Sequence, residues 1–196
     1  YNSSQKGLSI GNINGDFINN KITVSGKAIV QGGTLIGNYT YNTASATTIG
    51  DITGDFINNS VEISGYSSSV RTTGLIGNYA YHSGNYRNVI AKIGKINANF
   101  YNNNVTTYGN YTYGGIITNH VEGGYGNYAV IDSISGEFIN NGLKNTYSSS
   151  SSYTRGGAIY SNSTITNGIT DSLFRGNYVD ASGNAQGGAI YVSNYL

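Results

Sequence analysis

Acidic or amide side chains stand directly before four of the five phenylalanines of this chain. The residues at that position are Asp16, Asp55, Asn99 and Glu137. Two carboxylates held at a fixed separation are the groups with which most glycosidases cleave sugar polymers. An active site is normally a single feature of a protein, however, whereas this position recurs with every copy of the segment around it. We therefore interpret the column as part of the fold and predict no catalytic residue and no enzymatic activity.

The chain offers little that could hold a metal or a cofactor. Its two histidines, His82 and His120, do not have the spacing of metal ligands, and cysteine is absent. Residues 123–128 partly resemble a calcium-binding nonapeptide, but Tyr128 stands where the ligand Asp would be. The Gly-Gly pairs lack the Gly-Lys-Ser/Thr sequence that completes a phosphate-binding loop. We therefore predict no metal site and no cofactor.

Tyrosine is the residue type most open to a binding role, with 19 copies and no tryptophan. Two Tyr-x-Tyr pairs lie 40 residues apart, so on strands their rings should align on one face. Aligned tyrosines can bind a sugar or a protein because they give contact area at a low entropic cost. The alternative is that they are half-buried strand residues favoured by β-propensity. The candidate ligand-binding tyrosines are Tyr39, Tyr41, Tyr79, Tyr81, Tyr111 and Tyr113.

These candidates belong to an internal repeat. Residues 10–22 read Ile-Gly-Asn-Ile-Asn-Gly-Asp-Phe-Ile-Asn-Asn-Lys-Ile, and the shared core of all copies is Phe-x-x-Asn. Further copies occupy residues 49–61, 93–105, 131–143 and, shortened, 169–179. The phenylalanines fall 39, 44, 38 and 36 residues apart. A second motif, of small residues followed by apolar ones, comes about half a repeat later, at residues 33–36, 73–76, 114–117, 156–159 and 187–190. The sequence thus predicts a single domain, residues 1–196, of five repeats of about 40 residues.

The repeat favours strands over helices. Ile10, Ile13 and Phe17 have helical spacing, but Gly11 and Gly15 lie between them, and each costs about 1 kcal/mol in a helix relative to alanine. Because each repeat carries two motifs, we divide it into two turns of about 20 residues, each with about three strands. The prediction is an all-β, right-handed parallel β-helix (β-solenoid) of about ten coils, roughly 45 Å long. Neighbours in the acidic column would then lie two coils, roughly 9–10 Å, apart.

Composition excludes two classes of partner. Only 10% of the residues are charged and the net charge is +1, with no run of Lys or Arg. Nucleic acids and anionic membranes require clustered positive charge, so we expect neither as a partner. The sequence contains no apolar stretch long enough for a membrane-spanning helix, so we expect no direct membrane insertion of this segment. The chain begins at Tyr1 rather than Met, and we expect it to be a piece of a longer protein.

The two motifs together resemble a known family. Phe-x-x-Asn and Gly-Gly-Ala-Ile stand intact at residues 138–141 and 156–159, and again at 174–177 and 187–190. This alternation resembles the passenger repeats of the chlamydial polymorphic membrane proteins and related type V autotransporters. The first three small-residue motifs depart from that pattern. The resemblance implies a secreted β-helical passenger, held at an outer membrane by a C-terminal β-barrel and often serving adhesion.

Three functions follow as hypotheses. The first is an extracellular segment displayed on a bacterial cell surface, with a structural or adhesive role and a host-cell glycan or protein as partner. The second is a fibre subunit that self-associates end to end, because neither end of the repeat region shows a cap and a free strand edge can pair with another chain. The third is a polysaccharide-degrading enzyme, which lacks support from any motif in the sequence.

Overall fold

The computed structural model describes residues 2–4, 7–26, 30–42, 45–65, 72–82, 89–123 and 126–193, and these residues form strands and turns without a helix. Every strand pair among them is parallel. The strands form four sheets, which we number in the order in which β11, β12, β13 and β14 (residues 90–122) occupy them. The chain is therefore an all-β solenoid, as predicted.

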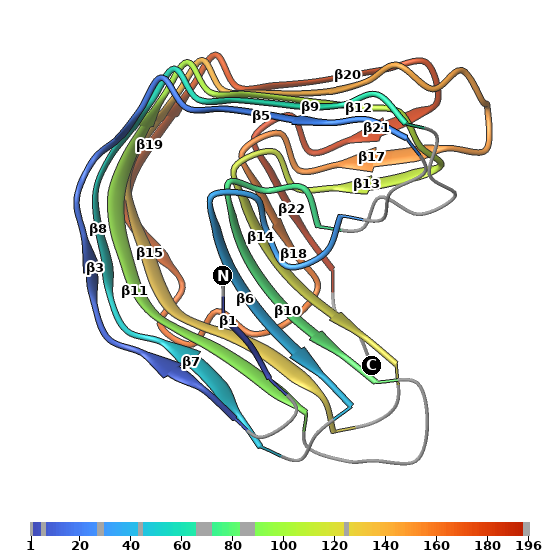
Figure 1. The fold of residues 1–196 in the computed structure, drawn as a ribbon. Coiled ribbons are helices and arrows are strands. Elements are labelled where there is room, and N and C mark those ends of the chain that lie inside the picture. Colours follow the sequence, from blue (N-terminus) through green and yellow to red (C-terminus); the bar gives the residue numbers. More distant parts are fainter. Residues whose placement is uncertain are drawn as a thin grey trace.

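Sheet 1 forms a long curved wall, and sheet 2 continues from the end of this wall as a separate layer (Figure 1). The rungs of sheet 1 are β2 (Ser9–Ile10), β3 (Ile13–Asn14) and β4 (Phe17–Ile18) together, β7 (Thr47–Ile49) with β8 (Ile52–Ile57), β11 (Ile90–Tyr101), β15 (Tyr128–Ile139) and β19 (Ile169–Arg175). Sheet 2 contains β5 (Lys21–Val24), β9 (Ser60–Ile63), β12 (Asn104–Thr107), β16 (Gly142–Asn145) and β20 (Tyr178–Ala181).

Sheets 3 and 4 bring the chain back across the molecule. Sheet 3 lies beneath sheet 2 and contains β13 (Tyr111–Tyr113), β17 (Tyr153–Arg155) and β21 (Asn184–Gln186). Sheet 4 faces sheet 1 and contains β1 (Asn2–Ser4), β6 (Ile36–Tyr41), β10 (Ile76–Tyr81), β14 (Ile117–Glu122), β18 (Ile159–Ser161) and β22 (Ile190–Val192). One visit to all four sheets, as in β11 to β14, completes one coil.

The prediction of about ten coils is wrong, because one repeat of about 40 residues makes one coil. The five rungs of sheet 1, one for each repeat, are joined by about four turns. Phe100 pairs with Phe56 on one side and with Phe138 on the other, and no small-residue motif lies between them. The two motifs of a repeat instead occupy facing walls of the same coil, sheets 1 and 4. Four steps of about 4.8 Å separate the first and last rungs of sheet 1, so this stack is roughly 19 Å high rather than 45 Å.

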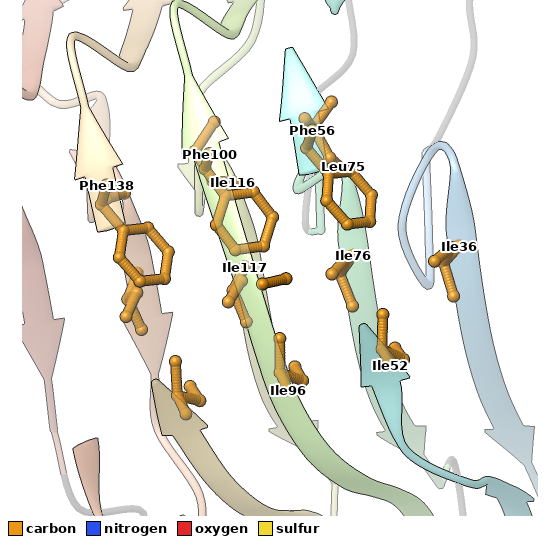
Figure 2. Close-up of a cluster of buried hydrophobic side chains, with 14 of the residues drawn as sticks. Ile36, Ile52, Phe56, Leu75, Ile76, Ile96, Phe100, Ile116, Ile117 and Phe138 are labelled. Carbon is orange, nitrogen blue, oxygen red and sulfur yellow. The ribbon is translucent and has the colours of Figure 1, made fainter. Parts of the chain in front are cut away.

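A ladder of phenylalanine rings fills the space between the walls. Successive rings from Phe17 to Phe174 have centroids 4.7, 4.8, 4.7 and 4.7 Å apart and stack nearly in parallel. Figure 2 shows the three central rings in a row beside the isoleucines of sheet 4. The rings of Phe56, Phe100 and Phe138 are fully buried. Burial of a phenylalanine side chain contributes about 1.5–3 kcal/mol, so this column is a large part of the stability of the core.

The Asn-Asn pair after each phenylalanine turns the chain from sheet 1 into sheet 2. The first residue of the pair has a left-handed backbone, with φ between 54° and 56° at Asn19, Asn58, Asn102 and Asn140. Asparagine tolerates this conformation better than other residues with a side chain. In the fifth repeat Gly176 takes the same position with φ of 66°. The corner therefore explains why this position holds only Asn or Gly.

The second residue of each pair forms a hydrogen-bonded ladder inside the corner. The Nδ2 atoms of Asn20, Asn59, Asn103 and Asn141 each donate to Oδ1 of the asparagine in the next rung, at 2.9, 2.9, 2.9 and 3.0 Å. The backbone N–H of the same residue donates to that oxygen as well. Each Nδ2 from Asn59 onward also donates to the phenylalanine carbonyl of the preceding rung, as Asn103 does to Phe56 at 2.7 Å. The amides of Asn59, Asn103 and Asn141 thus each join three rungs.

The fifth coil is shorter than the others because residues 162–168 run directly from β18 to β19. Here Asn162 closes the edge of β14: its Nδ2 donates to the Val121 carbonyl at 2.9 Å and its Oδ1 accepts from the Val121 N–H at 2.8 Å. Ser163 Oγ accepts from the N–H of Ala129 in the same way, at 3.1 Å. Asn162 and Ser163 therefore satisfy backbone groups of β14 and β15 at the place where the last coil is shorter.

Replacing Asn103 by alanine should lower the free energy of unfolding by about 2–3 kcal/mol, because two donors of Asn59 and the carbonyl of Phe56 lose a partner in a buried site. Asn97→Ala is the matched control, since Asn97 is an exposed asparagine of the same coil. We expect that control to change the free energy by less than about 0.5 kcal/mol. Urea unfolding measures both values, and equal effects of the two substitutions would contradict a structural role for the ladder.

Candidate functional site

The acidic column on sheet 1 links neighbouring rungs. Asp16 Oδ1 accepts a hydrogen bond from the N–H of Asp55 at 2.9 Å, and Asp55 Oδ1 accepts from Asn99 Nδ2 at 2.9 Å. Asn99 Oδ1 in turn accepts from the N–H of Glu137 at 3.1 Å. The predicted separation of two coils is wrong, because these residues lie in consecutive rungs. Their oxygens are engaged in holding the stack together.

Glu137 also acts on a neighbouring tyrosine. Its Oε2 accepts a hydrogen bond of 2.8 Å from the hydroxyl of Tyr101. This hydrogen bond raises the pKa of Tyr101, because removing the phenolic proton would place a negative charge beside the carboxylate. Tyr101 therefore stays protonated at neutral pH.

The histidines lie toward the C-terminal ends of two neighbouring strands of sheet 4. His120 Nε2 is 3.9 Å from Glu122 Oε2, and His82 follows directly after β10. Within the ranges that the structure describes, no group of three or more His, Asp or Glu side chains is placed to hold a metal ion. Gly124 and Tyr125 of the calcium-like segment lie outside the described residues. No helix in the described part of the chain is long and apolar enough to cross a membrane.

The Tyr-x-Tyr pairs align as predicted. Tyr39 is the strand partner of Tyr79 and Tyr41 is the partner of Tyr81, with ring centroids 5.2 and 5.5 Å apart and nearly parallel planes. The alternate residues of β6 point the other way, since Asn38 donates to carbonyls of sheet 1. The four tyrosines therefore lie on the outer face of sheet 4.

Their exposure differs from one ring to the next. Tyr79 has 0% of its surface exposed, so its ring cannot contact a ligand. Tyr39, Tyr41 and Tyr81 are partly exposed. We call these three residues the tyrosine ridge. The ridge is the part of the predicted tyrosine set on sheet 4 that a partner can reach.

In β14, the strand that follows β10 in sheet 4, the two columns no longer contain tyrosine. His120 follows Tyr79 in its column, and the two rings are 5.2 Å apart and stacked. Glu122 follows Tyr81, and its Oε2 accepts a hydrogen bond of 2.7 Å from the Tyr79 hydroxyl. This hydrogen bond links the Tyr79 column to the Tyr81 column and fixes the orientation of the Tyr79 ring.

The two remaining candidates, Tyr111 and Tyr113, lie on sheet 3 and not on the ridge. Tyr113 packs at the corner between sheets 3 and 4, with its ring 4.8 Å from Tyr160 and 5.3 Å from His120. Tyr111 stacks on Tyr153 and is 40% exposed. The structure therefore separates the six predicted tyrosines into a ridge, a buried ring and two sheet 3 residues with different surroundings.

Further residues pack around Tyr113 at the corner between sheets 3 and 4, and they were not among the predicted site residues. We call Tyr113, Tyr160, Tyr191 and Arg155 the corner cluster. Tyr160 stacks on Tyr191 at 5.6 Å, and its burial raises the pKa of its hydroxyl well above the ordinary value. The Arg155 guanidinium lies 4.9 Å from the ring centres of Tyr153 and Tyr191 and 5.9 Å from that of Tyr113, which are cation–π distances. A signal was present in the sequence, because Tyr160 and Tyr191 each follow a Gly-Gly-Ala-Ile motif directly.

No protein-family model, curated protein or solved structure matches this chain. What the protein does must therefore follow from its own geometry. That geometry offers a rigid wall of parallel strands with a ridge of stacked, partly exposed rings, and few charges around it. Such a surface can pack against the apolar face of a sugar ring or against a protein.

Proposed function

We propose that this chain is an extracellular, surface-displayed β-helical segment of a bacterial protein with a structural and adhesive role. The alternation of Phe-x-x-Asn and Gly-Gly-Ala-Ile supports a passenger of the autotransporter kind. Right-handed winding belongs to the proposal, because crossovers between parallel strands are right-handed in nearly all proteins. Enzymatic activity is not part of it, since the acidic column has a structural explanation in its contacts between rungs.

The observation that carries the adhesive role is the tyrosine ridge. Its rings project from neighbouring rungs of a sheet whose register is fixed by backbone pairing, so they present a preformed surface and lose little conformational entropy on binding. Tyr41 stacks on Tyr81 at 5.5 Å and lies 6.1 Å from Tyr39, and these three rings give an apolar surface with hydroxyl edges. A host-cell glycan or a protein surface is the partner that this combination favours.

The adhesive role predicts saturable binding of the purified chain to host cells or immobilised glycans. The double substitution Tyr41→Ala and Tyr81→Ala should weaken that binding by about tenfold or more, because it removes two rings of the ridge. Tyr178→Ala, which removes an exposed tyrosine of sheet 2, should bind as the unaltered chain does. Absence of saturable binding, or equal binding by the double variant with an unchanged melting temperature, would contradict the adhesive role.

A fibre subunit is the second candidate, and the distribution of exposed apolar side chains favours it. Ile10 and Ile18 are exposed in the first rung of sheet 1, and Leu173, Ile190 and Val192 are exposed in the last coil. Among the described residues, β19, β20, β21 and β22 pair on one side only. Strand edges with apolar neighbours can accept a further rung from the same chain or from another molecule.

End-to-end assembly predicts filaments in electron micrographs of the purified chain, with a length that grows with protein concentration. Leu173→Lys should shorten or abolish them, because it places a charge on the edge strand β19, with which the next rung would pair. Lys95→Glu, on the exposed face of β11, is the control and should leave assembly unchanged. Discrete particles of a single size at every concentration would exclude the fibre.

A further inference from the structure

A cavity of about 600 Å³ opens where the fifth coil departs from the path of the other coils. In the third and fourth coils, sheet 1 begins at Ile90 and Tyr128. In the fifth coil it begins at Ile169, which pairs with Ile134. The first half of β15 therefore pairs with the short connection through the Ile131–Ile165 bridge and a few hydrogen bonds instead of with a full strand, and the cavity lies in the space that a full-length coil would occupy.

The walls of the cavity contain no charged side chain among the residues that line it. Hydroxyl and amide groups come from the short connection, including Ser161, Asn162 and Thr164, and apolar surface comes from Val121 and Ile169. Asn162 and Ser163 are held by their hydrogen bonds to β14 and β15, so this wall is rigid.

Asn127, which also lines the cavity, has an unused hydrogen-bond donor. Only 6% of this residue is exposed, and its Oδ1 accepts a hydrogen bond of 3.2 Å from the N–H of Val89. Its Nδ2 has no hydrogen-bond partner among the described residues, although it is buried. A buried donor without a partner is unfavourable, and a ligand with an acceptor oxygen would remove that cost.

Tyr128, the next residue along the chain, stands at the cavity with 48% of its surface exposed. Its ring is therefore free on one side to stack against a ligand. The cavity thus combines one aromatic ring, a set of fixed hydroxyl and amide groups, and a volume within the range typical of small-molecule sites.

We propose that this cavity binds one residue of a neutral sugar, with the C–H face of the ring on Tyr128 and a hydroxyl oxygen accepting from Asn127 Nδ2. A charged ligand would enter without a countercharge, which is costly in a partly buried site. A wholly apolar ligand would leave the Asn127 donor without a partner. The inference deepens the proposed adhesive function, on which it rests, by naming the class of ligand, and it places that ligand away from the tyrosine ridge.

Titration of the chain with free glucose, galactose, mannose, N-acetylglucosamine and N-acetylgalactosamine, followed by NMR, tests the proposal. At least one should bind with a Kd of about 1 mM, and Tyr128→Ala should weaken it by about tenfold. Tyr178→Ala is the control for loss of an exposed tyrosine and should bind as the unaltered chain does. Asn127→Asp, which removes the donor and adds a charge, should also weaken binding, while glucuronic acid should bind less well than glucose.

The outcomes separate this proposal from the adhesive role of the ridge. No binding of any of the five sugars, or equal binding by the Tyr128→Ala variant, overturns the cavity site. If the Tyr128→Ala variant adheres to host cells normally while the Tyr41→Ala/Tyr81→Ala variant does not, the adhesive role stands without the cavity. If sugar binding at the cavity is confirmed but cell adhesion is absent, the adhesive role fails and the sugar site remains.

Discussion

The whole solenoid depends on the in-register stacking of like residues along the axis. The asparagine ladder restricts this register most strictly, because its buried amides need hydrogen-bond partners in the neighbouring rungs. Each inner amide, such as that of Asn103, must meet an amide on one side at 2.9 Å and a phenylalanine carbonyl on the other at 2.7 Å. A slip of one residue would bury unpaired donors and acceptors and would turn the phenylalanines out of the core. The ladder therefore fixes the register of sheets 1 and 2 together, because it stands at the corner between them.

Much of the fold could be predicted from the sequence. Glycine and asparagine between β-branched residues indicate strands and corners, and the recurring Phe-x-x-Asn core predicts the phenylalanine column. The number of coils could not be predicted, because periodicity gives the length of the repeat and not the number of walls it builds. Residues 111–113, for example, form a strand of a separate sheet that folds back beneath sheet 2, and nothing in their sequence indicates this path.

The candidate site was predicted only in part. Spacing alone places Tyr39 beside Tyr79, since in-register stacking follows from the repeat. The burial of Tyr79 and the corner cluster around Tyr160 depend on how sheets 3 and 4 pack, which spacing does not show. The cavity beside Tyr128 has a trace in the sequence, because the last repeat is the shortest. Its position becomes clear only when the pairing of β15 and β19 is known.

A single crosslinking measurement tests most directly whether one repeat makes one coil. Asn97 and Ser135 are strand partners on the outer face of sheet 1, and the chain has no cysteine of its own. In the Asn97→Cys/Ser135→Cys variant the two thiols should form a disulfide under mild oxidation, because neighbouring rungs bring the Cα atoms within about 7 Å. Thr53→Cys/Ser135→Cys, two rungs apart, should stay reduced. Failure of the first pair to crosslink would contradict the one-repeat coil, since with two coils per repeat those residues would lie roughly 9–10 Å apart.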